Sequence, residues 1–241
     1  MGASPLTPAQ RTRVAWHTIA EHVIAAARHR ATGRIGLRPL PGGFGSPWFP
    51  ASGEDGGDEQ RIRIDGTDLV VEERTDDGPH FSRREPISTL RAAGAFVGME
   101  PGAPDVYEAV TPLDLDAELA VDPTAAGELA RFLASVDEAL HALRTELDGG
   151  HATPDHAITL WPEHFDLATA IDEVNYGGSP ADDTHPAPYL YVGPWTPPTP
   201  DGAFWNEAFG ASSLDAAAVT TTAALEFFRE GRRRATELTA R

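Results

Sequence analysis

The chain has 241 residues and a formal net charge of −18, from 37 acidic residues against 19 basic ones, all of them arginine. This charge argues against nonspecific binding to nucleic acid or anionic membranes, because both need a cationic protein surface. The sequence has no cysteine and no lysine. It therefore excludes disulfides, thiolate metal sites, cysteine nucleophiles, a phosphate-loop lysine and Schiff-base chemistry.

Hydrophobic residues make up 41% of the chain, which is ordinary for a folded protein. We expect one α+β domain over residues 1–241, with a possible two-part arrangement that breaks near residues 116–122. No apolar run is long enough to cross a membrane, and residues 1–13 lack the apolar core of a signal peptide. The sequence thus predicts a cytoplasmic protein with no nucleic-acid partner, no membrane association and no cofactor, and it leaves the oligomeric state open.

A leading helix is expected from the N-cap Thr7 to about Arg30, since Pro8 suits the first helical position and Gln10 can complete a capping box. Residues 33–40 alternate apolar and polar side chains, which predicts a strand. The Gly-rich residues 42–45 lack the spacing of a dinucleotide-binding motif and are expected to form a loop.

Residues 61–64 and 69–71 predict two strands joined by a turn. A second turn at residues 76–78 would bring His80 and Phe81 back as a third strand, giving an antiparallel meander. A short helix is expected over residues 87–96, followed by a strand over residues 106–115.

Asp122 and Pro123 start the most regular helix of the chain, whose leucine-rich stripe continues to Gly149. The next compact pattern is Leu160–Ile171, which reads as a buried strand or bend. An aromatic strand at residues 189–192 precedes a proline-rich connection and a last helix from about Leu214 to Thr239. These elements predict antiparallel sheets covered by three main helices.

Leu160–Ile171 also concentrates ionisable groups, with Glu163, His164 and Asp166 close together. A histidine beside carboxylates can serve acid–base chemistry or bind a hard metal ion. Strand alternation places His164 and Asp166 on one face and Glu163 on the other. His164 and Asp166 are therefore weak catalytic candidates, and the alternative is that both bind backbone groups or cap a bend.

The leading helix carries His17, Glu21 and His22, in the pattern His-x-x-x-Glu-His. This is one residue longer than the inverted zinc-protease signature, so it does not support a zinc hydrolase. We expect these side chains to form a solvated helix face, and no metal site is predicted.

Aromatic residues and prolines gather in the C-terminal half, where they can wall a small-molecule pocket or form a core. The leading hypothesis is a small-molecule-binding domain without assigned catalysis. The alternatives are a metal-assisted hydrolase that uses His164 and Asp166, and a structural or interaction domain with no small-molecule site. The expected ligand-binding residues are Trp161, Phe165, Asp166, Tyr189 and Tyr191.

The layout resembles a bacterial family of the actinobacterial type, a domain of unknown function. The resemblance rests on a Gly-basic-Ile-x-Leu segment at residues 33–37, an Ile-rich hairpin at residues 61–78, Phe-Asp-Leu-Ala at residues 165–168 and a Pro-x-x-Tyr-x-Tyr strand ending at Tyr191. In that family Gly-Ser precedes Phe-Asp, where this chain has Pro-Glu-His. The resemblance therefore extends to Asp166 and not to His164, and it implies a fold but no reaction, ligand or partner.

Overall fold

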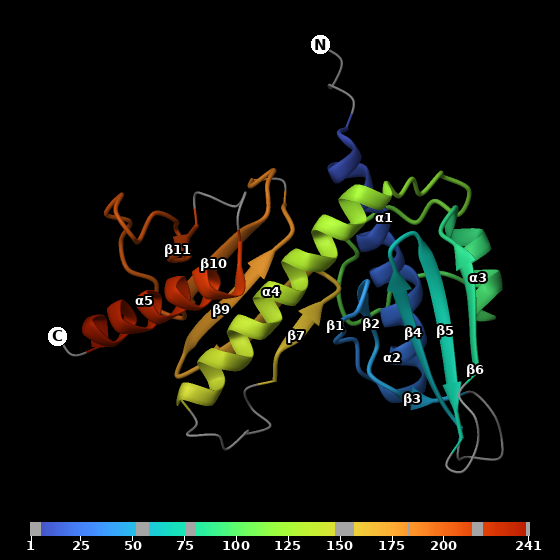
Figure 1. Ribbon diagram of the computed structural model, residues 1–241, viewed down its shortest axis with the longest axis horizontal. Helices are drawn as coiled ribbons and strands as arrows, with labels where there is room; N and C mark the ends of the chain where they lie inside the picture. Colours follow the sequence, from blue (N-terminus) through green and yellow to red (C-terminus); the bar gives the residue numbers. More distant parts are fainter. Residues whose placement is uncertain are drawn as a thin grey trace. The chain divides into compact units, whose positions relative to one another are not determined.

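The computed structural model describes residues 6–51, 58–75, 81–147, 157–182, 184–213 and 219–239, and it has an α+β fold with antiparallel sheets, as expected (Figure 1). The helical segments are α1 (Pro8–Ile19), η1 (Ala20–Ala25), α2 (Ala26–Thr32), α3 (Leu90–Val97), α4 (Pro123–Leu147) and α5 (Thr221–Thr239). The strands are β1 (Arg38–Leu40), β2 (Gly43–Gly45), β3 (Phe49–Pro50), β4 (Glu59–Asp65), β5 (Asp68–Arg74), β6 (Phe81–Pro86), β7 (Thr159–Trp161), β8 (Asp166–Ile171), β9 (Val174–Ser179), β10 (Tyr189–Pro194) and β11 (Ala211–Ser212).

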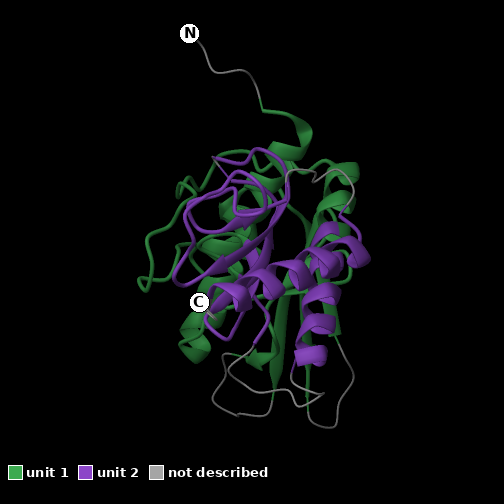
Figure 2. Ribbon diagram, turned by 90° about the vertical axis from the view of Figure 1, so that its left-hand side faces the viewer, with its two compact units in different colours: residues 1–131, 161–165 green, residues 132–160, 166–241 purple. Residues whose placement is uncertain are grey.

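The chain divides into two compact units (Figure 2). Unit 1 comprises residues 1–131 and 161–165, and unit 2 comprises residues 132–160 and 166–241. Residues 123–131 of α4 thus belong to unit 1, and residues 132–147 belong to unit 2. The expected single domain, with its break near residues 116–122, stays a prediction. No helix in the described ranges is long and apolar enough to span a membrane.

The sheet of unit 1 runs in the order β1-β2-β4-β5-β6, and β3 also pairs with β4. The β4–β5–β6 meander confirms the expected strands, although the turn at residues 76–78 and His80 lie outside the described residues. Residues 42–45 do not form only a loop, since Gly43–Gly45 is strand β2. A Cβ on Gly45 would lie 2.4 Å from Arg63 Cβ. Glycine therefore lets β2 approach β4 closely enough to pair.

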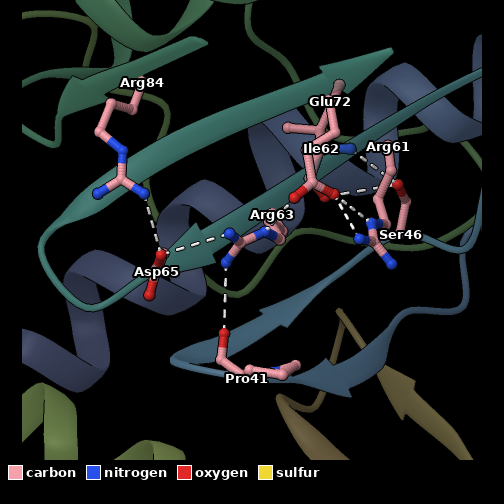
Figure 3. Close-up of polar contacts among 8 residues, drawn as sticks. All are labelled: Pro41, Ser46, Arg61, Ile62, Arg63, Asp65, Glu72 and Arg84. Atoms are coloured by element: carbon pink, nitrogen blue, oxygen red, sulfur yellow. Dashed lines mark hydrogen bonds and ion pairs between the residues drawn. The ribbon is translucent and has the colours of Figure 1, made fainter. Parts of the chain in front are cut away.

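One face of this sheet carries a ladder of arginine–carboxylate pairs (Figure 3). Glu72 accepts from Arg61 Nε at 2.6 Å and from Arg63 Nε at 3.0 Å. Asp65 lies 3.3 Å from Arg63 and 3.2 Å from Arg84. Each of these two carboxylates thus pairs with an arginine of another strand. A one-residue slip of the register would move the partners to opposite faces of the sheet, so the pairs favour the observed register.

The leading helix begins as expected, because Thr7 and Gln10 form the capping box. Its middle, η1, is π-helical, so one extra residue fits into the turn. Trp16 packs edge-on against Phe44 of the sheet, with ring centroids 5.7 Å apart, and donates to the Gly66 carbonyl at 3.3 Å. The helix is therefore fixed to the sheet of unit 1 by its apolar face.

The prediction of a strand over residues 106–115 is wrong. Residues 101–119 contain no helix or strand, and they connect α3 to the segment before α4. The strand expected over residues 33–40 is confirmed only at its end, where β1 begins at Arg38. In the segment 101–119, the amides of Val110 and Thr111 donate to Glu21 instead of to a neighbouring strand.

The sheet of unit 2 runs in the order β11-β10-β9-β8-β7. Its registers place Gly178 between Leu167 and Leu190, on the face that carries the buried side chains. The second half of α4 packs there, because a Cβ on Gly178 would lie 2.9 Å from Val136. The helix α5 covers the same sheet, with Gly231 against Val192 and the Phe228 ring 6.2 Å from that of Tyr176.

Leu160–Ile171, read as a strand or bend, forms β7, a turn at residues 162–165 and β8. Phe165 adopts φ 51° in this turn, and its amide donates to the Trp161 carbonyl at 2.8 Å. Pro194 ends strand β10 instead of standing outside the ladder. Residues 214–218 of the expected last helix, together with His151 and His156, lie outside the described residues.

Candidate binding face of the second sheet

The face of the unit 2 sheet opposite Leu167 and Leu190 carries polar and aromatic side chains. Strand alternation places Asp166 of β8 and Tyr189 and Tyr191 of β10 on this face. Tyr191 pairs with Gly177 of β9, and a Cβ on Gly177 would lie 2.5 Å from the Tyr191 hydroxyl oxygen. Glycine at this position therefore lets the Tyr191 ring lie flat across the sheet toward Asp166.

Each tyrosine of this face donates its hydroxyl to a carboxylate. Tyr191 donates to Asp166 Oδ2, and Tyr189 donates to Asp182 Oδ2 at 2.6 Å. The other oxygen of Asp182 accepts from the backbone amides of Thr184 at 2.7 Å and His185 at 2.6 Å. These bonds fix both rings and the segment that follows β9.

Four rings form a continuous cluster on this face. The His185 and Tyr189 centroids are 4.4 Å apart, and those of Tyr189 and Tyr191 are 6.2 Å apart. Phe209 closes the cluster, 6.3 Å from Tyr191 and 6.5 Å from His185. The Phe209 side chain remains 39% exposed, so solvent reaches the cluster.

Two further groups hold His185 in place. Its Nε2 lies 2.9 Å from Glu207 Oε1, and the Ser212 hydroxyl donates to the same oxygen at 2.8 Å. The hydrogen bond to Glu207, followed by the attraction of Asp182, raises the pKa of His185 above its ordinary value, against the opposing effect of burial. The surroundings of Tyr189 thus stabilise a positive charge.

Two carboxylates of this face, Glu207 and Asp182, have pKa values below their ordinary ones. The hydrogen bond from His185 lowers the pKa of Glu207. Burial acts to raise the pKa of Asp182, but the hydrogen bonds from Tyr189 and from two backbone amides outweigh it and lower that pKa. Burial and the adjoining carboxylates raise the pKa of Tyr189 and Tyr191, so both phenols remain neutral donors. The face is therefore aromatic and negatively charged.

A scan of the sequence against protein-family models matched none, and searches of curated proteins and of solved structures found no similar protein. The resemblance to the bacterial family therefore stays a prediction. What this face can do has to be argued from its own geometry.

The structure brings together three of the five expected ligand-binding residues, Asp166, Tyr189 and Tyr191. Trp161 and Phe165 belong to unit 1. Phe165 is 1% exposed and stacks on His17 with ring centroids 5.0 Å apart, whereas the Trp161 side chain is 38% exposed. Phe165 is thus a core residue of unit 1.

The hydrolase alternative used His164 and Asp166, and it stays a prediction. His164 is exposed and belongs to unit 1, and Asp166 belongs to unit 2. Across the described ranges, no group of three His, Asp or Glu side chains is arranged to hold a metal ion.

Sequence patterns did not indicate Asp182, His185, Glu207 and Phe209 as members of this face. They come from the connections that follow β9 and precede β11, where no periodicity marks a side chain as facing the sheet. One local signal was present, because Asp182 lies three residues before His185, a spacing that suits an aspartate bonded to backbone amides in a turn.

The expectation that His17, Glu21 and His22 form a solvated helix face is wrong. Their exposed fractions are 4%, 0% and 2%. Glu21 accepts from the amides of Val110 at 3.0 Å and Thr111 at 2.8 Å, and from the Thr111 hydroxyl at 2.5 Å. The segment 101–119, which the sequence does not reveal as a partner of this helix, contacts Glu21 and His22, whereas His17 contacts Pro162 and Phe165.

Proposed function

We propose that unit 2 binds a small organic cation on the aromatic and acidic face of its sheet. The observation that carries this proposal is the contact between the His185 and Tyr189 rings, which are tilted by 33°, while His185 is paired with Glu207. A cation over an aromatic ring gains roughly 0.5–2 kcal/mol, depending on how far it is removed from water. The protein therefore already stabilises one positive charge among these rings.

The edge of the cluster is exposed to solvent, where a ligand cation can reach it. Phe209 presents an exposed ring next to Tyr191, and the Asp182 side chain is 39% exposed. Aromatic faces and carboxylates together favour a quaternary ammonium or guanidinium group over a neutral or anionic one. The formal charge of −18 adds long-range attraction for such a ligand.

Choline and its neutral carbon isostere 3,3-dimethylbutan-1-ol provide the test, since they share a shape and differ in charge. Titration calorimetry or NMR titration should show choline binding at least roughly 10-fold more tightly than the alcohol. Equal affinities would refute cation recognition and leave a site for neutral molecules. Absence of binding by both would refute the proposal as a whole.

Two variants place the binding on this face. Phe209→Leu keeps an apolar side chain and removes the ring, so choline affinity should fall by roughly 2–30-fold. Trp195→Leu is the matched control, because Trp195 is also an exposed aromatic residue of unit 2 but contacts Asn175. Equal effects of the two variants would contradict the assignment to the Phe209 cluster.

A further inference from the structure

Unit 1 contains a second polar cluster, formed by the leading helix and the segment 101–119. Glu21 and His22 lie in the π-helical η1, a type of segment that occurs frequently at functional sites. The segment 101–119 has no regular secondary structure, and loops of this length are uncommon in compact domains unless they have a function. The two features meet at the hydrogen bonds between Glu21 and Thr111.

His22 forms hydrogen bonds with the segment 101–119 at two points. The Gly102 amide donates to the His22 carbonyl at 3.0 Å, and His22 Nε2 lies 3.0 Å from the Thr111 carbonyl oxygen. A carbonyl oxygen can only accept, so Nε2 carries a proton, and in this tautomer Nδ1 is an acceptor. His22 is 2% exposed, and its Nδ1 has no hydrogen-bond partner among the described residues.

Two more buried polar atoms of the cluster lack a partner in the described part of the chain, Tyr107 Oη and Glu163 Oε2. Tyr107 belongs to the stretch between the two points fixed by His22. Burial, and then the Glu21 and Glu163 carboxylates, raise the pKa of Tyr107, so its neutral hydroxyl lies within the field of both. Leaving such groups without a partner costs about 1–3 kcal/mol each.

The cluster is negatively charged as well as rich in acceptors. Burial lowers the pKa of His17, so its imidazole, which lies 3.7 Å from Glu21, is neutral at pH 7. Arg13 contributes a positive charge near His17. Glu21 and Glu163 together carry one formal negative charge more than Arg13 balances.

We infer that this cluster binds a primary ammonium group, with Tyr107 Oη and Glu163 Oε2 as acceptors and His22 Nδ1 as a further acceptor in the same cluster. A primary ammonium ion has three N–H donors and one positive charge, which matches these acceptors and the excess negative charge. A metal ion fits less well, because no described group of three His, Asp or Glu side chains is arranged to hold one.

This site is independent of the one proposed in unit 2, and the two differ in ligand chemistry. A quaternary ammonium ion has no N–H donor, so it cannot satisfy Glu163 and Tyr107. Methylammonium chloride and sodium chloride at equal concentration therefore provide the test in thermal unfolding, because both supply the same ionic strength and the sodium ion has no N–H donor. Methylammonium should raise the unfolding midpoint of the wild-type protein above its value in sodium chloride.

Glu163→Gln should weaken methylammonium binding by roughly 10-fold or more, because a hydrogen bond to a charged partner is lost. Glu108→Gln is the control, since Glu108 is an exposed acid of the same segment. Tyr107→Phe, which removes only the hydroxyl, tests the site again if Glu163→Gln fails to fold. Phe209→Leu should leave methylammonium binding unchanged.

Three results would overturn the inference. One is an equal midpoint of the wild-type protein in the two salts. Another is a methylammonium response that survives both Glu163→Gln and Tyr107→Phe. The third is a loss of the response in Glu108→Gln as large as in Glu163→Gln, which would mean that general charge and not this cluster attracts the ion.

Discussion

His17 stays neutral in the folded protein because burial lowers the pKa of its imidazole below the ordinary value of 6.5. Attraction by Glu21 and the hydrogen bond to the Pro162 carbonyl oppose this effect, and repulsion by Arg13 and His22 adds to it. Below pH 6.5 the unfolded chain therefore binds more protons at this position than the folded chain. The contribution of His17 to the free energy of unfolding is complete above pH 6.5 and is lost as the pH falls below it.

Replacing this residue by His17→Gln should flatten the pH dependence of stability in that range. Urea unfolding at about pH 8 and about pH 5 measures the difference, compared between the variant and the wild-type protein. His164→Gln is the matched control, because His164 is exposed, and it should leave the pH dependence unchanged. The same slope in His17→Gln and in the wild-type protein would show that His17 protonates as freely when folded as when unfolded.

The fully buried Glu21 accepts three hydrogen bonds, from two backbone amides and the Thr111 hydroxyl. In Glu21→Gln one carboxylate oxygen becomes an NH₂ group, which cannot accept from a backbone amide. We expect a loss of about 1–3 kcal/mol in the free energy of unfolding, the usual penalty for a buried donor left without a partner. Chemical denaturation measures it, and Glu108→Gln should change stability by less than about 0.5 kcal/mol. Equal effects of the two variants would mean that Glu21 does not fix segment 101–119.

Helix α4 lies close to the unit 2 sheet at Gly178 of β9. A Cβ on Gly178 would lie 2.9 Å and 3.1 Å from atoms of Val136 and Phe132. Gly178→Ala should therefore destabilise the protein by about 1–3 kcal/mol through overpacking. Gly127→Ala is the matched control on α4 itself, since its Cβ would meet no atom within 4 Å.

The control Gly127→Ala should stabilise the protein by up to about 1 kcal/mol, because alanine favours a helix more than glycine does. Thermal or urea unfolding of both variants gives the two signs. If Gly178→Ala also stabilised the protein, α4 would have to lie farther from β9 than the structure places it.

Local patterns predicted the elements whose signals are contained in their own residues. The capping box of α1, the hairpin of β4 and β5, and the leucine stripe of α4 all appear as expected. Other parts of the fold depend on contacts between residues that are far apart in the sequence. The π-helical η1 and the irregular segment 101–119 depend on hydrogen bonds across about ninety residues, as between Glu21 and Thr111, and no window of sequence contains both partners.

Local sequence patterns predicted the candidate site in unit 2 only in part. Strand alternation and aromatic density identified Asp166, Tyr189 and Tyr191, which share one face of the sheet. The same aromatic density also indicated Phe165. In the structure, however, a turn in which Phe165 has a positive φ directs its side chain into the core of unit 1. His185 and Phe209 enter the cluster through connections whose course is set by tertiary packing, so their roles become visible only in three dimensions.

In the whole chain, acidic residues outnumber basic ones by 37 to 19, which leaves an excess of 18 negative charges. The ion pairs seen in the described residues are mostly at the surface, as in Arg233–Glu230 and Arg229–Glu146. Each such pair contributes only about 0–1 kcal/mol. Repulsion within this excess of negative charge therefore opposes the compact state more than these pairs support it.

Adding sodium chloride should consequently stabilise the protein, because the screening length falls to about 10 Å at 0.1 M and weakens the repulsion. The free energy of unfolding in urea should rise between about 0.02 M and about 0.3 M salt, with most of the gain at the lower concentrations. Potassium chloride should have the same effect if screening is the cause. A fall in stability would show instead that arginine–carboxylate pairs, such as those joining Arg61 and Arg63 to Glu72, outweigh the excess negative charge.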